Sequence, residues 1–323
     1  MTPAQSCTSA PAQTRSLSGS KSIPSAAKLS APQLKLKVIF VTGAAGRSGT
    51  TLVARLLGEI AGCVNIGEAQ YLFDRKTRVG NPPCGCGSLV AACPFWKEIE
   101  QAVPREVQDY AGRWVRTRRS PLLLTSYRRG PLSRGYREFL STLRRTYADI
   151  ARRADCRTII DTTKSPWYLL ALSQLPDVEV NVLHLVRSPA AVVTSWSRQK
   201  NYTPPEPAWR VLAEWSLHNA LFEALGGRAH RYWRIRFEDL IAAPQSILEP
   251  IAAEILGRPF TLPFVAPNRA RVGVQHILVS NADKLTGGEI TIRPETQRAI
   301  PWRKKILVDL LTFPLLWRYG YFS

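Results

Sequence analysis

Acidic residues and long hydrophobic runs are both scarce in this sequence. Its 323 residues include 44 Lys and Arg but only 24 Asp and Glu, which gives a formal net charge of +20. Such an excess of positive charge favours anionic partners: nucleic acid, acidic membranes, or small phosphorylated and sulfated molecules. No run reaches the roughly 18 apolar residues that a membrane-spanning helix needs. The apolar segment 306–317 is interrupted by Asp309 and Pro314, so we expect a core helix there rather than an interfacial one.

The first 34 residues contain no acidic side chain and only three basic ones, Arg15, Lys21 and Lys28. Because a Ser-, Ala-, Pro- and Thr-rich segment cannot bury enough apolar surface to fold, we predict a disordered tail over residues 1–34. The tail lacks the apolar stretch of a secretory signal, and an organellar transit peptide is the alternative. We expect residues 35–323 to form a single domain in the cytoplasm, with peripheral membrane contact as a further option.

Apolar strand patterns alternate with helical patterns along most of the chain. Strands are predicted at 37–42, 157–161, 178–186 and 231–236, and helices from 50, from 167 to 175, from 189 and from 208 to 225. This alternation predicts an α/β fold, a P-loop-like open parallel β-sheet flanked by helices. Residues 71–153 have no clear strand pattern, and ten arginines lie between positions 111 and 150. We interpret 71–153 as a mostly helical, basic insertion or lid.

A glycine-rich loop, Gly43–Gly49, separates the first predicted strand from a helix that starts at Thr50. In such a loop, backbone N–H groups and the helix N-terminus converge on an anion. Thr50 and Thr51 can add hydroxyl donors, and Arg47 can add a planar fork of charged donors. A nucleotide-triphosphate P-loop needs a lysine immediately before its Ser or Thr, but Gly49 occupies that position. The remaining alternative is a tight turn with no ligand.

A second candidate for anion binding is the segment from His184 to Ser195. Arg187 lies at the carboxyl end of a predicted strand, where open α/β sheets bind ligands, and Ser195 follows eight residues later in a helix. An arginine at a strand end is often only a surface ion pair. Two anion-binding devices at one sheet edge, however, favour a ligand that is charged at both ends.

These two motifs resemble those of the sulfotransferases that use 3′-phosphoadenosine 5′-phosphosulfate (PAPS), in particular the bacterial and carbohydrate-type branch. The resemblance implies that Arg47, Ser48, Gly49, Thr50 and Thr51 hold the 5′ end of PAPS. It also implies that Arg187 and Ser195 hold the 3′-phosphate. Further similar segments are 161–166, 236–244, 84–87 with 93–96, and 315–321. The expected activity is transfer of a sulfuryl group to a hydroxyl of a glycan, a lipid or a small metabolite.

Sulfuryl transfer needs cations near the leaving oxygen and a base near the acceptor hydroxyl. Arg47 and Lys164 are the candidate cations, although Lys164 could instead be solvated or paired with Asp161. By resemblance to carbohydrate sulfotransferases, Glu68 is the candidate catalytic base. The alternative is that Glu68 only begins a helix over residues 69–75.

Three further polar residues are weaker candidates. His184 and His218 could act as bases, but we expect both to be structural, because His184 lies in a strand pattern and His218 on a helix. Lys284, in the late loop 276–293, is expected to contact the nucleotide, by a loose resemblance to a loop that closes over it in relatives.

The cysteines at positions 84, 86 and 93 cluster among glycines and prolines. Their spacing is not that of a standard zinc ribbon. Cys63 could supply a fourth zinc ligand, and a disulfide or free thiols are equally compatible with the pattern. We expect no metal requirement, because arginine, lysine and backbone donors already face the donor's charge.

Two other functions fit parts of the sequence. A P-loop kinase would use the same type of fold, but it would need the missing lysine and Mg²⁺ ligands. A nucleic-acid-binding protein could use the arginine-rich stretch 113–145, with its tyrosines available for stacking. That hypothesis leaves both candidate phosphate motifs unexplained, so we expect no specific nucleic-acid partner.

Overall fold

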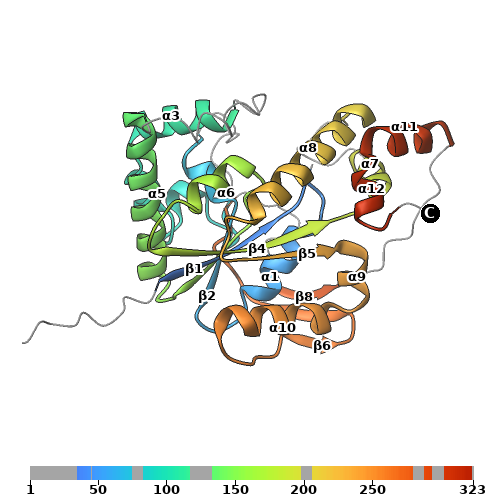
Figure 1. Cartoon of the computed structure of the whole chain (residues 1–323). Coiled ribbons are helices and arrows are strands. Elements are labelled where there is room, and N and C mark those ends of the chain that lie inside the picture. The colour runs from blue at the N-terminus through green and yellow to red at the C-terminus, as the bar shows by residue number, and fades with distance from the viewer. Residues whose placement is uncertain are drawn as a thin grey trace, which may run out of the picture. The chain divides into compact units, whose positions relative to one another are not determined.

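Five parallel strands form the central sheet of the computed structural model (Figure 1). Their order is β2-β3-β1-β4-β5, with bounds Leu36–Thr42 (β1), Cys63–Gly67 (β2), Thr158–Asp161 (β3), Val178–Val186 (β4) and Arg231–Arg236 (β5). The structure describes residues 35–44, 46–74, 83–116, 133–197, 206–278, 287–292 and 302–321. The predicted open parallel sheet is confirmed. β2 is a strand that the sequence pattern did not predict.

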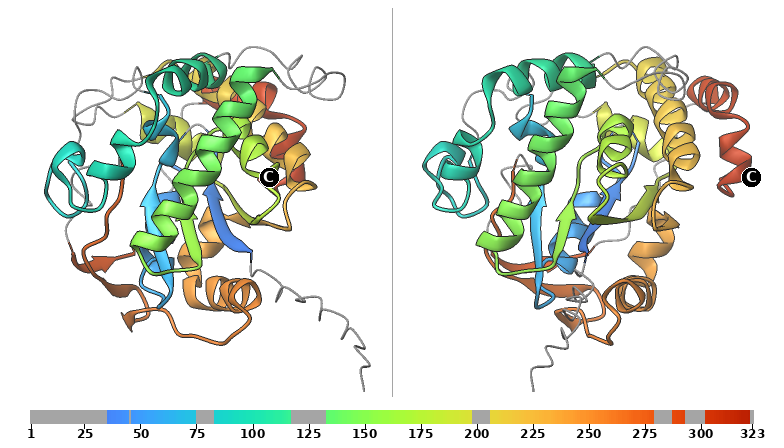
Figure 2. Two further views of the ribbon diagram at one scale, coloured as in Figure 1. Left: turned by 90° about the vertical axis from the view of Figure 1, so that its left-hand side faces the viewer. Right: turned by 60° about the vertical axis from the view of Figure 1, so that its left-hand side comes forward.

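Helices cover both faces of this sheet, because successive side chains of each strand point to opposite faces. Along β1, Val38 and Phe40 belong to one hydrophobic core, while Ile39 and Val41 belong to another. The first core packs against α5 (Arg134–Arg153), α6 (Pro166–Leu172) and α8 (Ala208–Gly226). The second packs against α1 (Thr50–Leu57), α9 (Phe237–Ala242) and α10 (Pro244–Leu256). Figures 1 and 2 show these two layers on either side of the strands.

The segment between β2 and β3 is mostly helical in the part that the structure describes. It contains two 3₁₀ turns, η1 (Ala69–Leu72) and η2 (Val90–Ala92), and the helices α2 (Lys97–Gln101), α3 (Arg105–Arg116) and α5. Several arginines of α5 form ion pairs, namely Arg134 with Glu138, Arg144 with Asp177, Arg152 with Asp149, and Arg153 with Glu98. Part of the positive charge of this basic segment is therefore neutralised within the fold.

A second, antiparallel sheet lies beside α1 and was not predicted. Its strands are β6 (Phe264–Ala266), β7 (Arg269–Val272) and β8 (Gly288–Thr291), in the order β6-β7-β8. Ala270 and Val272 of β7 pack into the same core as α1. The strands have only three or four residues each, which is too short for a period-two pattern to be distinctive.

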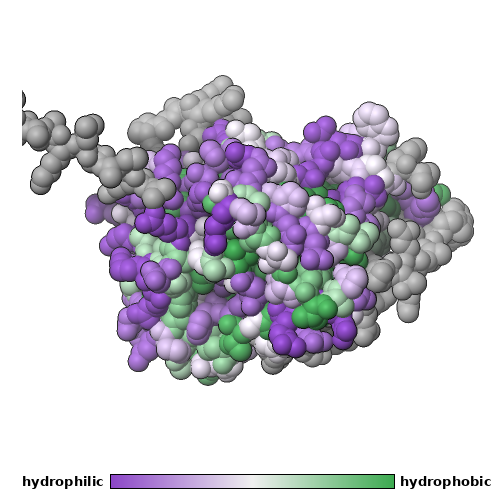
Figure 3. Space-filling model, turned by 90° about the horizontal axis from the view of Figure 1, so that it is seen from below, coloured by the Kyte–Doolittle hydropathy of each residue, from purple (hydrophilic) through white to green (hydrophobic). Residues whose placement is uncertain are grey.

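The C-terminal helices α11 (Trp302–Thr312) and α12 (Leu315–Arg318) pack near α7 (Pro189–Trp196) and α8. The expectation of a core helix over 306–317 is wrong in part. Val308 and Leu316 are buried, but Ile306, Leu310, Phe313 and Trp317 are exposed. No helix among the described residues is long and apolar enough to cross a membrane. On the face shown in Figure 3, hydrophilic residues surround smaller hydrophobic patches.

His184 is a fully buried structural residue on β4, as expected. Its Nε2 lies 2.8 Å from Oδ1 of Asn219, and its Nδ1 lies 2.7 Å from the hydroxyl of Tyr232. Because the Asn219 oxygen only accepts, Nε2 carries the proton and Nδ1 accepts from Tyr232. Both hydrogen bonds therefore fit a neutral ring, and burial lowers the pKa of His184 to about 4.

We expect His184→Gln to reduce the acid sensitivity of the fold. Because the pKa is lowered, the neutral ring contributes its full stability at pH values above the ordinary histidine pKa of 6.5. This contribution is lost as the pH falls toward 4. Between about pH 7.5 and pH 5, the wild type should lose about 2 kcal/mol through this one group. The measurement is urea unfolding of both proteins at both pH values. If the free energy of unfolding fell by the same amount between the two pH values in the wild type and in His184→Gln, His184 would not be the source of the acid sensitivity.

Candidate active site

The candidate site residues follow the strands at one edge of the central sheet. Because all five strands are parallel, their carboxyl ends meet at this edge, where open α/β sheets bind ligands. Going across the sheet, the groups are Glu68 after β2, Lys164 after β3, the loop 43–49 after β1, Arg187 after β4 and Arg236 at the end of β5. Residues distant in the sequence are thus brought to one edge, with the glycine-rich loop near the middle.

The glycine-rich loop has a backbone shaped to surround an anion. Gly46, Arg47 and Gly49 have positive φ values of 64°, 55° and 88°, and α1 starts at Thr50 without a side-chain cap on its first turn. Ser48 is almost fully buried, and its hydroxyl has no hydrogen-bond partner among the described residues. Uncapped N–H groups at a helix N-terminus and a buried hydroxyl are suited to a phosphate- or sulfate-sized anion.

Gly49, like Gly43, is a position in this loop where the backbone needs the absence of a side chain. A Cβ there would overlap the ring of Phe237, the first residue of α9. The left-handed φ of Gly49 adds to this requirement. Phe237 therefore packs directly on the start of α1 and helps to fix the shape of the loop.

Arg47 and Arg187 lie side by side at this edge. Arg187 donates from Nη1 to the carbonyl oxygen of Arg47. The Arg187 guanidinium lies 5.0 Å from the centre of the Phe237 ring, and that of Arg47 lies 4.6 Å from the Trp196 ring. Burial and then the neighbouring charge of Arg187 lower the pKa of Arg47. Two cations held together in this way are stabilised by an anion between or beside them.

Ser195 and Trp196 lie in the last turn of α7, the helix that follows Arg187. Ser188, at the start of this helix, donates from its backbone N–H to Oε1 of Glu238 at 3.0 Å. The other carboxylate oxygen of Glu238 accepts from the Tyr321 hydroxyl at 2.5 Å. Tyr321 and Glu238 thereby connect the C-terminal segment to the segment that carries Arg187 and Ser195.

Glu68 and Lys164 form an ion pair between Oε1 and Nζ. Both side chains are mostly buried, with 17% and 21% exposed, so the pair is shielded from most of the solvent. The alternative pairing of Lys164 with Asp161 is wrong. Glu68 does stand directly before the 3₁₀ turn η1, as the alternative of a helix-starting residue expects, but its side chain makes no capping hydrogen bond to that turn.

Asp161 has a different role from the one considered for it. It is fully buried at the end of β3 and accepts hydrogen bonds from the Tyr147 hydroxyl and, at 2.7 Å, from the backbone N–H of Thr163. Burial raises the pKa of Asp161 to about 6. These bonds shape the turn that presents Lys164, so Asp161 is a positioning residue that the local sequence pattern could not identify.

A cavity of about 240 Å³ adjoins the Glu68–Lys164 pair and the glycine-rich loop. His218 lines this cavity, with Nδ1 3.7 Å from Oε1 of Glu214, so it is not a residue of the core alone. Sequence reasoning missed most of the other lining residues, which include Tyr71, Trp167, Trp196, Glu206 and Arg210. They come from separate segments, and only the fold brings them together.

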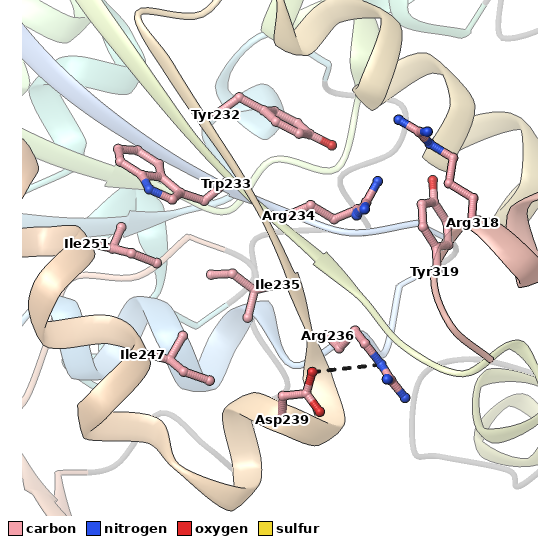
Figure 4. Close-up of a pocket in the computed structure, with 10 residues that line it drawn as sticks. All are labelled: Tyr232, Trp233, Arg234, Ile235, Arg236, Asp239, Ile247, Ile251, Arg318 and Tyr319. Atoms are coloured by element: carbon pink, nitrogen blue, oxygen red, sulfur yellow. Dashed lines mark ion pairs between the residues drawn. The ribbon is translucent and has the colours of Figure 1, made fainter.

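A larger cavity of about 550 Å³ lies along β5 (Figure 4). β5 is the edge strand on the other side of the sheet from β2, the strand that precedes Glu68. Its charged groups are largely engaged with protein partners: Arg234 and Arg318 both pair with Glu223, and Arg236 pairs with Asp239 at 3.9 Å. Neither Glu68 nor Lys164 lines it. We therefore assign the candidate active site to the smaller cavity.

Two other expectations concern Lys284 and the cysteines. Lys284 lies outside the described residues. The five described cysteines are free, so the disulfide alternative for Cys84, Cys86 and Cys93 is wrong. Cys63 lies near Cys156 and Thr158 at the start of β2 and is not part of the cysteine cluster at 84–93.

We expect Gly49→Ala to destabilise the protein more than Gly62→Ala, a matched control. Both glycines have a left-handed φ, but a Cβ at Gly62 has no atom within 4 Å. The control should cost about 1–2 kcal/mol of backbone strain, and Gly49→Ala about 1–3 kcal/mol more through overlap with Phe237. Urea unfolding measures both costs. The double variant Gly49→Ala/Phe237→Ala should lose less stability than the sum of the losses in the two single variants, because removal of the ring removes the overlap. A loss equal to that sum would exclude the overlap.

Comparison with known proteins identifies the family. A model of the sulfotransferase family matches residues 38–261, and no curated protein gives a significant match. The sulfotransferase domain from the Synechococcus PCC 7002 olefin synthase is 21% identical, with 86% of this chain and 94% of that chain covered and a TM-score of 0.46. A sulfotransferase from Alicyclobacillus acidocaldarius is 12% identical, with coverages of 88% and 98% and a TM-score of 0.39. Because the family match spans more than half of its length, this chain belongs to the sulfotransferase family.

Proposed function

We propose that the enzyme transfers a sulfuryl group from PAPS to a hydroxyl of an acceptor that enters the smaller cavity. One observation carries this proposal: the anion-shaped loop at 43–49 lies at the same sheet edge as Arg187 on one side and the Glu68–Lys164 pair on the other. A donor with phosphate at one end and phosphosulfate at the other matches that order of cations. The buried hydroxyl of Ser48, which has no partner among the described residues, fits the 5′ end.

The donor-binding residues divide into two groups. Arg47, Ser48, Gly49, Thr50 and Thr51 would hold the 5′ phosphosulfate through backbone N–H groups, hydroxyls and one guanidinium. In the second group, Arg187 and Ser195 would hold the 3′-phosphate. Arg187 is kept in place by its bond to the Arg47 carbonyl and by the Phe237 ring, so little side-chain freedom is lost on binding.

Glu68 is the proposed general base. It accepts the proton of the acceptor hydroxyl while the acceptor oxygen bonds to sulfur and the bond from sulfur to the bridging phosphate oxygen breaks. Lys164 and Arg47 stabilise the negative charge that develops on that leaving oxygen. In the free protein Lys164 pairs with Glu68, and a bound donor gives Lys164 a second anionic partner. As Lys164 turns toward the donor, Glu68 is released to the acceptor.

The cavity limits what the acceptor can be. About 240 Å³ accommodates one ring or head group, and the cavity has aromatic walls from Tyr71, Trp167 and Trp196. Glu206 and Arg210, which pair with each other, add polar groups at its edge. These features support an acceptor whose hydroxyl-bearing end is a small ring, on a small metabolite, a glycan or a lipid head group.

The two alternative functions have less support. Gly49 still stands where a kinase P-loop has its lysine, so binding of a triphosphate is disfavoured. For nucleic-acid binding, several arginines of α5 are in ion pairs with carboxylates, which lowers the charge available to a phosphate backbone. The proposal needs no metal ion for sulfuryl transfer itself, because the donor's charge faces Arg47, Lys164 and Arg187.

We expect the desulfated product, 3′-phosphoadenosine 5′-phosphate (PAP), to bind far more tightly than ATP in isothermal titration calorimetry. Arg187→Ala should weaken PAP binding by about 30-fold or more, the loss expected for a desolvated charge pair. Arg152→Ala is the matched control, because Arg152 pairs with Asp149 on the exposed surface of α5. A folded wild-type protein that does not bind PAP would overturn the proposed donor.

We expect Glu68→Gln to lower turnover by roughly 10²- to 10⁴-fold, the range for loss of a general base, while PAP affinity is retained. Glu98→Gln is the control, since Glu98 pairs with Arg153 on the surface and should turn over like the wild type. The readout is sulfate transfer from labelled PAPS to a panel of hydroxylated acceptors. Unchanged turnover in Glu68→Gln would exclude Glu68 as the base.

A further inference from the structure

Three cysteines and a histidine from distant parts of the chain meet at one point. Cys84, Cys86 and Cys93 lie in the segment after η1, and His276 lies almost two hundred residues later, after β7. The three sulfur atoms and one histidine nitrogen all lie within 4.8 Å of one another. Cys84 and Cys93 are fully buried. The cluster is not used in the proposed transfer of the sulfuryl group.

Four of the six distances within this cluster are close to those of ligands around a single tetrahedral ion. The sulfur of Cys93 lies 3.6 Å from that of Cys84 and 3.7 Å from that of Cys86, and Nδ1 of His276 lies 3.3 Å and 3.7 Å from Cys93 and Cys84. Zinc bonds of about 2.3 Å to sulfur and 2.0 Å to nitrogen place tetrahedral ligand atoms about 3.5–3.8 Å apart. A disulfide would need sulfur atoms about 2.05 Å apart.

The backbone around the cysteines supports such a site. A tight turn holds Cys84 and Cys86 together: the N–H of Cys84 donates to the carbonyl of Ser88 at 2.7 Å, and that of Gly87 donates to the carbonyl of Cys84 at 2.9 Å. At Gly85, a Cβ would overlap the carbonyl oxygen of Gln275. The lack of a side chain at Gly85 therefore lets the segment that carries His276 approach the two thiols.

Two aromatic residues hold His276 in the orientation that directs Nδ1 at the sulfurs. The Phe95 ring stacks on the imidazole, with centres 5.0 Å apart and planes 11° from parallel. Trp96 donates from Nε1 to the backbone carbonyl of His276 at 3.0 Å. Oriented ligands with fixed surroundings are typical of metal sites in proteins.

We propose that Cys84, Cys86, Cys93 and His276 bind one Zn²⁺ ion as a structural site. Four protein ligands of the Cys₃His type leave no open position for a substrate, so the ion would stabilise the fold rather than take part in chemistry. His276, and not Cys63 as the sequence also allowed, is the fourth ligand of such a site. The sequence could not pair His276 with the cysteines, since nothing local links them.

The site would also fix the position of Glu68. Next to His276, Leu278 forms two backbone hydrogen bonds with the end of β2: its N–H donates to the carbonyl of Ile66 at 2.9 Å, and its carbonyl accepts from the N–H of Glu68 at 3.1 Å. A metal ion that holds His276 to the cysteine loop therefore holds the strand end from which Glu68 projects.

The first test is elemental analysis of the full chain, purified without chelators and with any histidine tag removed. We expect about one zinc ion per chain in the wild type and loss of this zinc in Cys93→Ser. Cys156→Ser is the matched control, because Cys156 is a free cysteine outside the cluster, and it should keep its zinc. A folded wild type without zinc after growth in zinc-supplemented medium would overturn the proposal, as would unchanged zinc in Cys93→Ser.

A second test covers the case in which Cys93→Ser does not fold. Replacement of zinc by Co²⁺ in the wild type should give thiolate charge-transfer and tetrahedral d–d absorption bands. His276→Ala should then weaken metal binding, in competition with a coloured chelator, by at least the roughly 10- to 100-fold that loss of an outer-shell partner costs. The absence of cobalt bands, or unchanged affinity in His276→Ala, would exclude the site. Neither test uses PAP or sulfate transfer, so failure of the proposed function would leave both results valid.

Discussion

The parallel pairing of β1 between β3 and β4 is the constraint on which the rest of the structure depends. β1 pairs with β3 from Lys37 to Phe40 and with β4 from Leu36 to Thr42. This register places the carboxyl ends of the central strands at the same level, so the loops that follow them lie at one edge of the sheet. A shift of one residue in either pairing would move the side chains of that strand to the opposite faces of the sheet and disrupt both hydrophobic cores.

Two half-buried arginines, Arg47 and Arg187, lie close together at this edge, and their protonated forms disfavour each other. Burial and the adjacent Arg187 lower the pKa of Arg47, because the protonated guanidinium is disfavoured by both. An anion at the loop would reverse this penalty, so charge that opposes folding in the free protein would favour binding of the proposed donor. The rings of Trp196 and Phe237 contact the two guanidinium groups and help to keep them in place without a ligand.

Local sequence patterns predicted the features that depend on neighbouring residues. β1, β3, β4, β5 and the glycine-rich loop all follow from apolar runs and turn residues a few positions apart. β2 was missed because Asn65 interrupts its apolar pattern, although that side chain is buried and its Nδ2 donates to Oε1 of Gln275 at 2.8 Å. The partner of Lys164 and the histidine of the cysteine cluster were missed because each contact joins residues far apart in the chain.

The segment from Gln275 to Leu278 links these non-local features into one arrangement. Gln275 bonds to Asn65 of β2 and, at 2.9 Å, to the carbonyl of Arg55 in α1, so it ties β2 to the helix that follows the glycine-rich loop. His276 reaches the cysteines, and Leu278 pairs with the strand end before Glu68. The position of the proposed base relative to the proposed donor loop is therefore set by the pairing of β2 with β3 and also by four consecutive residues distant in sequence from both. A change that releases this segment would therefore alter the position of Glu68 relative to the glycine-rich loop without a change in either of them.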